Sequence, residues 1–564
     1  MPVPCPLLQV HASRALECGS ALRQRGGRPR NYGMRPMTRL LLAGAAALSL
    51  TACVTTATPA EPVQGALSEA TIKEATRILS SDALPGNNGS WFQEVPLVEI
   101  TGRDHAPLVV RGAGGSDSFA FASDWVGVTY REGARTALDN SELVFVGYGI
   151  VAPEKGWNDY EGIDMRGKTA VILVNDPDYM ASDLTGPFGG KAMTYYGRWT
   201  YKFEEAARQG AAGALIVHDT YPAAYGWNVV ESSWTGPQVY PRRADGGASQ
   251  TAINGWLQKA AAERLLARAG KGDLATLSAA AARPGFRAVP LGVTASTSFA
   301  NDLRRFASKN VIGVLPGRSR LDEYVLHTAH WDHLGRCTPD PDGDDICNGA
   351  VDNASGTAAL IALAEAHVKA GPTARSQVFL AVTGEESGLL GSEYYAANPV
   401  FPLAQTAGGV NMDALSLAGP SRDVGVIGGG KSALDDYLAR ALAEQGRAGT
   451  PDANPQAGYY YRSDHFSLAK RGVPMLYVKG GQDLVTGGRA AGAAADADYR
   501  ANRYHRPGDE FDPAWDWSGV MQDLQLYYRL ARMLGNDSAW PNWREGDEFR
   551  GTRDQSCAAG TRGC

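Results

Sequence analysis

Apolar residues in the second half of this chain fall into short runs that alternate with stretches of helical periodicity. Continuous apolar runs predict strands at residues 310–317, 324–330, 377–383, 408–413 and 473–480. Periodic apolar positions predict helices at residues 356–370, 388–398, 431–445 and 517–534. Regular alternation of this kind predicts an α/β fold in which helices cover a sheet as a sandwich.

The first half has a different pattern of apolar positions. Strands are predicted at residues 91–100, 142–151, 168–176 and 211–219, and helices at 68–80, 203–210 and 253–269, the first with Ser68 as its N-cap. No cluster of metal-ligating residues occurs between about 118 and 270. The one histidine there, His218, ends an apolar run and is interpreted as a structural or loop residue.

A series of histidines and carboxylates gives the second half its candidate chemistry. In chain order these are His330, Asp332, Asp352, Glu385, Glu386, Asp413 and His505. Zinc binds neutral imidazole nitrogen and carboxylate oxygen, and a second ion nearby needs a carboxylate shared between the two. One further carboxylate remains to handle a proton. Several of these residues follow predicted strands, where α/β sheets usually place their sites, so the pattern predicts metal-assisted hydrolysis.

The motifs HWDH, DNASG, EESGLLGS, NMD, SDHF and YHRPGDE resemble those of the co-catalytic dizinc aminopeptidases of the aminopeptidase-Y and bacterial leucyl aminopeptidase kind. The resemblance covers about residues 310–534 and the stretch from residue 68. Residues 118–285 resemble the β-rich protease-associated domain often inserted in this family. The resemblance implies a mixed-sheet α/β sandwich of the zinc exopeptidase type, with peptidase parts at residues 67–117 and 286–540 and a tail at 541–564.

The same resemblance implies roles for individual residues. One zinc ion would be held by His330 and Asp413, the other by Glu386 and His505, with Asp352 bridging both ions. Glu385 would act as general acid/base on a water whose pKa the metals lower.

Four further residues receive roles around this centre. Asp332 is expected to orient His330 through a hydrogen bond. Tyr460 matches the position whose hydroxyl helps to hold the substrate carbonyl oxygen. Ser463 and Asp464 belong to the same substrate-binding loop, and the expected partners are peptide substrates.

Four other histidines in this half of the chain are considered as metal ligands. His327 lies at odd register from His330 within one strand and should face the opposite way. His333 is the nearest rival to His330 as a ligand. His367 is expected on the surface of its helix, and His465 is expected to shape its loop rather than bind metal.

The N-terminal region reads as an export signal. Residues 34–53 combine Arg35 and Arg39 with a short apolar stretch that ends in Leu-Thr-Ala-Cys, which resembles a bacterial lipobox and makes Cys53 the expected lipidated residue. A plain secretory signal is the alternative. We expect residues 1–53 to be leader and signal peptide, 54–66 to be a tether, and the mature protein to lie in the periplasm or cell envelope.

Charge and cysteine usage agree with export. Residues 1–52 carry seven arginines and one glutamate, so their removal changes the formal net charge from −6 to −12. Such acidity argues against nucleic-acid binding. The expected disulfides are Cys337–Cys347 and Cys557–Cys564, with thiolate zinc ligands as the weaker alternative. The acidic loop at residues 338–345 is either solvated or a calcium site.

The sequence therefore favours an exported metallo-aminopeptidase that uses two zinc ions. A carboxypeptidase, a dipeptidase or a one-zinc aminoacyl cyclase of related type is the alternative, and a non-catalytic metal-binding receptor is a third reading. Carboxypeptidase relatives often bind a C-terminal carboxylate with basic residues, and the sequence alone identifies no such arginine. Residues 482–503, which are rich in glycine and alanine, are expected to form a lid over the site. Side-chain preference and oligomeric state stay undetermined.

Overall fold

The computed structural model describes residues 68–73 and 91–559. All of these residues belong to one compact unit. The expected leader, the tether and Cys53 lie outside the described residues, as does Cys564, the expected partner of Cys557. Within the described part, no helix has both the length and the apolar composition needed to cross a bilayer.

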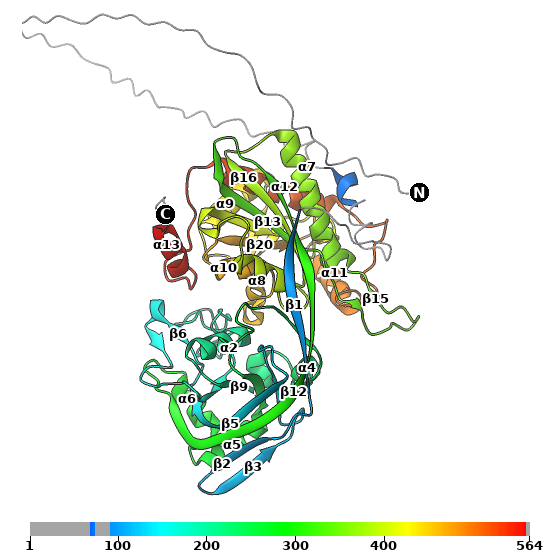
Figure 1. Ribbon diagram of the computed structural model, residues 1–564. Helices are drawn as coiled ribbons and strands as arrows, with labels where there is room; N and C mark the ends of the chain where they lie inside the picture. Colours follow the sequence, from blue (N-terminus) through cyan, green and yellow to red (C-terminus); the bar gives the residue numbers. More distant parts are fainter. Residues whose placement is uncertain (1–67, 74–90, 560–564) are drawn as a thin grey trace, which may run out of the picture. The chain divides into compact units, whose positions relative to one another are not determined.

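A large mixed sheet organises the described residues (Figure 1). Its peptidase-like half has the strand order β19-β18-β20-β17-β13-β16-β12. The bounds of these strands are Ala448–Pro451, Asp423–Ile427, Met475–Gly480, Thr406–Asn411, Arg320–His330, Arg375–Val382 and Val289–Leu315. β13 is parallel to both β16 and β17, whereas β12 is antiparallel to β16. The predicted α/β class with a mixed sheet is thereby confirmed.

Helices cover both faces of this half, as a sandwich requires. One face packs on α7, α9 and α12, which span Gly356–Ala370, Leu434–Gln445 and Ser518–Asn536. The other face packs on α8 (Leu390–Ala397) and α10 (His465–Ala469). Strand periodicity sends neighbours to opposite layers: Val325 joins the first core and Leu326 the second.

The other half of the sheet continues from β12 through β5, β8, β9, β11 and β4. Their bounds are Arg135–Phe145, Thr169–Leu173, Gly213–His218, Ile253–Gln258 and Trp125–Val128. Two cores flank it, one against α5 (Lys259–Ala269) and α6 (Leu274–Ala281), the other against α2 (Trp199–Arg208) and α4 (Trp227–Trp234). β2 (Leu108–Gly112) contributes Leu108 and Val110 to the first of these cores, so this packing unit begins before the expected boundary at residue 118.

A paired ribbon connects the two halves. β12 is 27 residues long, and β1 (Phe92–Arg103) pairs with it antiparallel from Phe92 opposite Val311 to Arg103 opposite Ala300. Figure 1 shows β1 and β12 side by side along this stretch. β10 (Gln238–Pro241) adds a strand to the other edge of β1, so the chain enters and leaves the first-half segment through hydrogen-bonded strands.

The predicted helix at residues 253–269 is wrong in its first six residues. Residues 253–258 form β11, which pairs parallel with β9 and antiparallel with β4, and the helix α5 begins only at Lys259. Ile253, Trp256 and Leu257 are buried within this strand. An apolar run buried on both faces has no period-two signal that separates it from the start of an alanine-rich helix.

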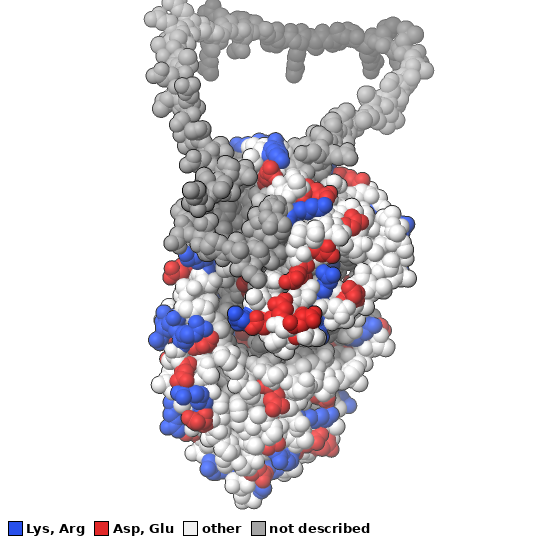
Figure 2. Space-filling view, turned by 90° about the vertical axis from the view of Figure 1, so that its right-hand side faces the viewer, with Lys and Arg blue, Asp and Glu red and all other residues white. Residues whose placement is uncertain are grey.

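The acidic loop lies between two short strands, β14 (Gly335–Arg336) and β15 (Ile346–Cys347), which pair antiparallel. The predicted Cys337–Cys347 disulfide is present. One Asp340 oxygen accepts the main-chain N–H groups of residues 342 and 344, at 2.9 and 3.0 Å. On the face of Figure 2, which carries β15 and α11 (Gly488–Asn502), Asp and Glu side chains gather at mid-height. Among the described residues, the acids of this loop do not form a metal-binding group.

Candidate metal centre

Three strand ends bring the candidate ligands to one edge of the sheet. His330 is the last residue of β13 and lies opposite Val382, the last residue of β16, while Thr328 lies opposite Asn411, the last residue of β17. Glu385, Glu386 and Asp413 follow β16 and β17 within four residues. Because parallel strands end at the same edge of the sheet, His330 and Asp413, which are 83 positions apart in sequence, meet in space.

The imidazole of His330 faces two carboxylates. Its Nε2 lies 3.2 Å from Asp352 Oδ1 and 3.7 Å from Asp413 Oδ1, and the ring is buried. Its Nδ1 lies 3.0 Å from the main-chain oxygen of Asp332. A carbonyl oxygen only accepts hydrogen bonds, so Nδ1 carries the proton of a neutral ring and Nε2 presents its lone pair to the carboxylates.

His505 approaches the same aspartate from the other side. Its Nε2 lies 3.4 Å from Asp352 Oδ2 and 3.2 Å from Glu386 Oε2. The backbone of His505 has a φ of 57°, and the ring of Tyr504 stacks on its imidazole at 4.0 Å between centroids. Asp352 thus offers one oxygen to each imidazole, which is the arrangement expected of a bridging carboxylate.

His333 lies beside the cluster and not at its centre. Its Nδ1 is 2.7 Å from Glu386 Oε1, the oxygen that does not face His505. The two carboxylates of Asp352 and Asp413 face His330. This geometry agrees with His330, and not His333, as the ligand.

The electrostatics of the cluster favour bound cations. Burial alone would lower the pKa of His330, but Asp352 and Asp413 raise it well above its usual value. Burial also opposes the charge of His505, yet Asp352 and Glu386 raise its pKa to about 10. Four carboxylates share this small buried space, and the buried Nε2 of His330 has no hydrogen-bond partner. Lone pairs that face one another in this way are stable only with positive charge between them.

Glu385 lies at the inner side of the same group. Its carboxylate, His330 and Asp413 offer ligand atoms that all lie within 4.8 Å of one another. Burial raises the pKa of Glu385 well above its usual value, and the neighbouring Asp413, Asp464 and Glu386 raise it further. A carboxyl group in this setting holds a proton more readily than a solvated one, as general acid/base work near neutral pH requires.

The predicted hydrogen bond between Asp332 and His330 is present, but it uses the main-chain oxygen of Asp332 and not its carboxylate. That carboxylate is 3.8 Å from His330 Nδ1 and accepts the main-chain N–H of Glu385 at 3.1 Å. The main-chain oxygen of Asp332 orients the imidazole instead. The turn after β13 thereby positions two site residues, His330 through a carbonyl group and Glu385 through a carboxylate.

The predicted role of Tyr460 does not fit its placement. Its ring is buried between Lys431 and His465, and its hydroxyl lies 3.5 Å from the main-chain oxygen of Met475. Tyr460 is absent from the residues that line the cavity described below, whereas Tyr459, on the same turn, lines it. Tyr460, three positions before Ser463, is therefore part of the core in this protein.

The two remaining loop predictions separate. Ser463 lines the cavity, and its hydroxyl donates to Asp413 Oδ2 at 2.5 Å while accepting from the Asn411 side chain at 2.7 Å. The Ser463 side chain therefore contacts Asp413, a candidate metal ligand. Asp464 is fully buried, does not line the cavity, and has its pKa raised by burial to about 7, so direct substrate binding by Asp464 does not fit the structure.

Asp509 is a site residue that the sequence reasoning missed. Its buried carboxylate accepts the main-chain N–H groups of Val351 and Asp352 at 3.0 and 3.1 Å. The Asp352–Asn353 peptide bond in this loop is cis. Asp509 lies four residues after His505 in YHRPGDE, and this adjacency to a candidate ligand was the available signal.

The other histidines have structural surroundings. His327 faces away from His330, as predicted: its ring stacks on Phe379 and its Nε2 is 2.9 Å from Gln377 Oε1. His218 is buried, with Nε2 3.0 Å from the main-chain oxygen of Tyr225. His367 was expected on the surface but is fully buried, because its ring packs between Phe379 of β16 and Tyr528 of α12.

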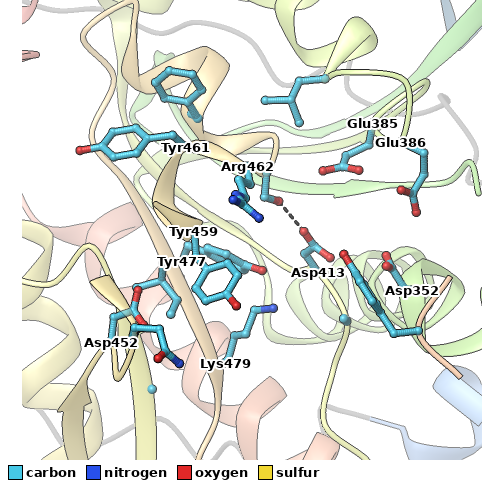
Figure 3. A pocket seen from close by; sticks show the side chains of 18 of the residues that line it. Asp352, Glu385, Glu386, Asp413, Asp452, Tyr459, Tyr461, Arg462, Tyr477 and Lys479 are labelled. Carbon is cyan, nitrogen blue, oxygen red and sulfur yellow. Dashed lines mark hydrogen bonds between the residues drawn. The ribbon is translucent and has the colours of Figure 1, made fainter. Parts of the chain in front are cut away.

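A cavity of about 890 Å³ opens at the cluster. Figure 3 shows Asp352, Glu385, Glu386 and Asp413 along one side, and Tyr459, Arg462 and Lys479 projecting into the same space. The helix α11, within the expected lid at residues 482–503, lines the cavity with Arg489, Tyr499 and Arg500 among others. α2 and β10 of the first-half segment also contribute residues to the lining. The size is typical of a site for a small molecule or a short peptide.

This fold and site define a hydrolase-type centre with the donor set of a metal site. Residues 310–529 match the sequence profile of peptidase family M28. The match confirms the peptidase class that the motifs indicated. No curated protein matches the sequence.

Three solved structures show weak overall similarity. An aminopeptidase from Aneurinibacillus sp. strain AM-1 has 18% identity and a TM-score of 0.39, covering 84% of this chain and 95% of its own. The zinc aminopeptidase BSAP from Bacillus subtilis has 17% identity and a TM-score of 0.32, with coverages of 84% and 89%. A peptidase M28 precursor from Shewanella amazonensis SB2B has 17% identity and a TM-score of 0.36, with coverages of 86% and 96%. Scores this low carry no conclusion about fold or function.

Proposed function

We propose that this protein is a metallo-aminopeptidase that removes N-terminal residues from peptides with two zinc ions. The observation that carries the proposal is the convergence of two imidazoles and four carboxylates beside one cavity, inside the segment that matches a peptidase family. Nitrogen and carboxylate oxygen are donors that zinc accepts. Residues His330 and Asp413 would hold one ion and Glu386 and His505 the other, with Asp352 shared.

Bound zinc would polarise the scissile carbonyl group and make water more acidic. The chain itself supplies the proton transfer. Glu385 takes a proton from the attacking water and returns it to the leaving amine, which its raised pKa favours. Ser463 fixes Asp413 through its hydroxyl, and Asp509 fixes the loop of Asp352 through two main-chain hydrogen bonds.

Replacement of Glu385 by Gln tests the role of this residue. The amide has nearly the same shape but cannot accept the proton, so kcat/KM should fall by a factor of about 10²–10⁴. Metal content, measured by elemental analysis after gel filtration, should stay at the wild-type value. Glu365→Gln is the matched control, since Glu365 pairs with Lys369 on α7 away from the cavity. Turnover by Glu385→Gln at the wild-type rate would reject the assignment.

The class of exopeptidase is tested by the substrate's free ends. An aminopeptidase should cleave leucyl-p-nitroanilide but not its N-acetylated form, whereas a carboxypeptidase would cleave N-blocked peptides. A metal-loaded protein that turns over neither kind would support the receptor interpretation instead. A zinc requirement would be shown by loss of activity in the presence of a chelator and by its return when zinc is added.

We further propose that the protein is exported and anchored by a lipid on Cys53. The lipobox-like sequence at residues 50–53 and the Cys337–Cys347 disulfide support this proposal, because such bonds persist in oxidising compartments. Mass spectrometry of the mature N-terminus should find acylated Cys53, and an intact residue 1 in the mature protein would refute the proposal.

A further inference from the structure

Several cationic side chains of the cavity lining form no ion pair with the described residues. Three of them, Arg198, Arg462 and Lys479, are here called the basic wall. In the part of the chain that the structure describes, none of the three forms an ion pair, and their recorded contacts are cation–π contacts of Arg462 with Tyr459 and of Lys479 with Tyr477. Two other cations of the lining are neutralised: Lys470 by Glu204 at 3.2 Å and Glu393 at 3.0 Å, and Arg500 by Asp496 at 2.9 Å.

Arg198 is the most unusual member of the basic wall. Its Nε is buried and has no hydrogen-bond partner. Burial, with a smaller effect from the nearby positive charge of Arg462, lowers the pKa of Arg198 to about 10. A half-buried guanidinium beside a second guanidinium is unfavourable unless an anion lies against both.

The surroundings of Arg198 hold it at this place. Three residues earlier, the ring of Tyr195 packs against Phe466 of α10, with 5.2 Å between centroids. Six residues later, Glu204 accepts a hydrogen bond from Lys470. Both contacts join the first-half segment to the part of the chain that carries the candidate metal centre, and they hold the chain on either side of Arg198 at the cavity wall.

Arg462 and Lys479 extend the wall toward the candidate metal centre. Arg462 directly precedes Ser463, whose hydroxyl donates to Asp413. Figure 3 shows both cationic groups pointing into the cavity on the side of Asp413 away from Glu386.

We propose that the basic wall binds a carboxylate group of the peptide substrate. The inference rests on the proposed peptidase function and deepens it by naming a substrate class. Guanidinium groups match carboxylates in geometry and charge. Peptides carry this group either at a free C-terminus, which a cavity of this size reaches only in short peptides, or on an acidic side chain. Arg198 would give the first-half segment a part in substrate recognition.

Matched substrate pairs test the inference with the full-length, zinc-loaded protein. Leu-Gly-Gly is compared with Leu-Gly-Gly-amide, and Glu-p-nitroanilide with Gln-p-nitroanilide, each as kcat/KM. We expect the carboxylate form of at least one pair to be cleaved about tenfold faster, as a charge-assisted hydrogen bond provides. Arg198→Gln and Arg462→Gln should each reduce this ratio toward one.

Further variants separate recognition from folding. Arg198→Lys should retain part of the ratio, because it keeps the charge without the planar fork. Arg166→Gln is the control, an exposed arginine of the same segment paired with Asp164 and outside the cavity. Arg462 is exposed, so Arg462→Gln keeps the test valid if Arg198→Gln does not fold.

The outcomes are distinguishable. Faster cleavage of the carboxylate form in the first pair assigns the wall to a C-terminal carboxylate. Faster cleavage of the carboxylate form in the second pair assigns it to an acidic side chain. Equal rates within both pairs, in wild type and variants alike, overturn the basic wall and leave the peptidase proposal standing. Failure of the zinc-loaded wild type to cleave any of the four substrates overturns the peptidase proposal itself.

Discussion

Replacement of His327 by Leu should make the protein less sensitive to acid. His327 is fully buried, its ring stacks on Phe379 with centroids 4.6 Å apart, and its Nε2 lies 2.9 Å from Gln377 Oε1. Burial lowers the pKa of His327 to about 4, and the hydrogen bond with Gln377 only partly opposes this effect. The unfolded chain has an ordinary histidine pKa of about 6.5.

The sign and size of the effect follow from these two pKa values. Below pH 6.5 the unfolded state binds a proton that the folded state does not bind until about pH 4, so acid favours unfolding. Linkage gives a loss of about 2 kcal/mol at pH 5 and of about 0.1 kcal/mol at pH 7.5 for this one group. Leucine does not titrate, so the free energy of unfolding of the variant relative to wild type should improve by about 2 kcal/mol between these pH values.

Urea unfolding of both proteins at pH 7.5 and pH 5, followed by tryptophan fluorescence, measures this change. Val325→Ala is the control, since it removes buried volume from the same strand without a titrating group, and its effect should be equal at both pH values. If the difference between His327→Leu and wild type changed by less than about 0.5 kcal/mol, the range within which independent effects add, the reasoning from burial would be refuted.

Three further outcomes are expected. Ser463→Ala removes the hydroxyl that fixes Asp413 and should weaken zinc binding about 10–100-fold in a chelator competition; unchanged affinity would show that the contact is dispensable. Asp509→Asn places an amide where two main-chain N–H groups need an acceptor, and should cost about 1–3 kcal/mol in the unfolding of the metal-free protein; equal stability would argue against its positioning role. Opening the bond between Cys337 and Cys347 with a reductant should destabilise the protein by at most about 3 kcal/mol, and an unchanged unfolding midpoint would mean that its loop opens independently.

Much of the fold was predictable because its signals are local. The helix at residues 356–370 has the predicted bounds, since a glycine and a proline follow it directly. The opposite orientations of His327 and His330 followed from the two-residue period of a strand. The candidate ligands were predictable from six motifs in order.

The rest depends on contacts that the local sequence does not encode. The burial of His367 comes from the packing of α12 on α7, which a helical pattern alone does not reveal. The hydroxyl of Tyr460 points to Met475 because the turn that carries it packs into a core with Trp543 and Phe549. Arg198 and Arg462 are 264 positions apart, so no sequence window brings them together.

The pairing of β1 with β12 has a consequence for how such a chain can change over evolution. The segment between these strands leaves and rejoins at positions that lie opposite each other, such as Gly102 and Asn301. Joining those two positions by a short turn would convert the ribbon into an ordinary hairpin and leave the remaining ladder intact. A module attached in this manner can be lost, exchanged or grafted in a single genetic event, with little disturbance to its host.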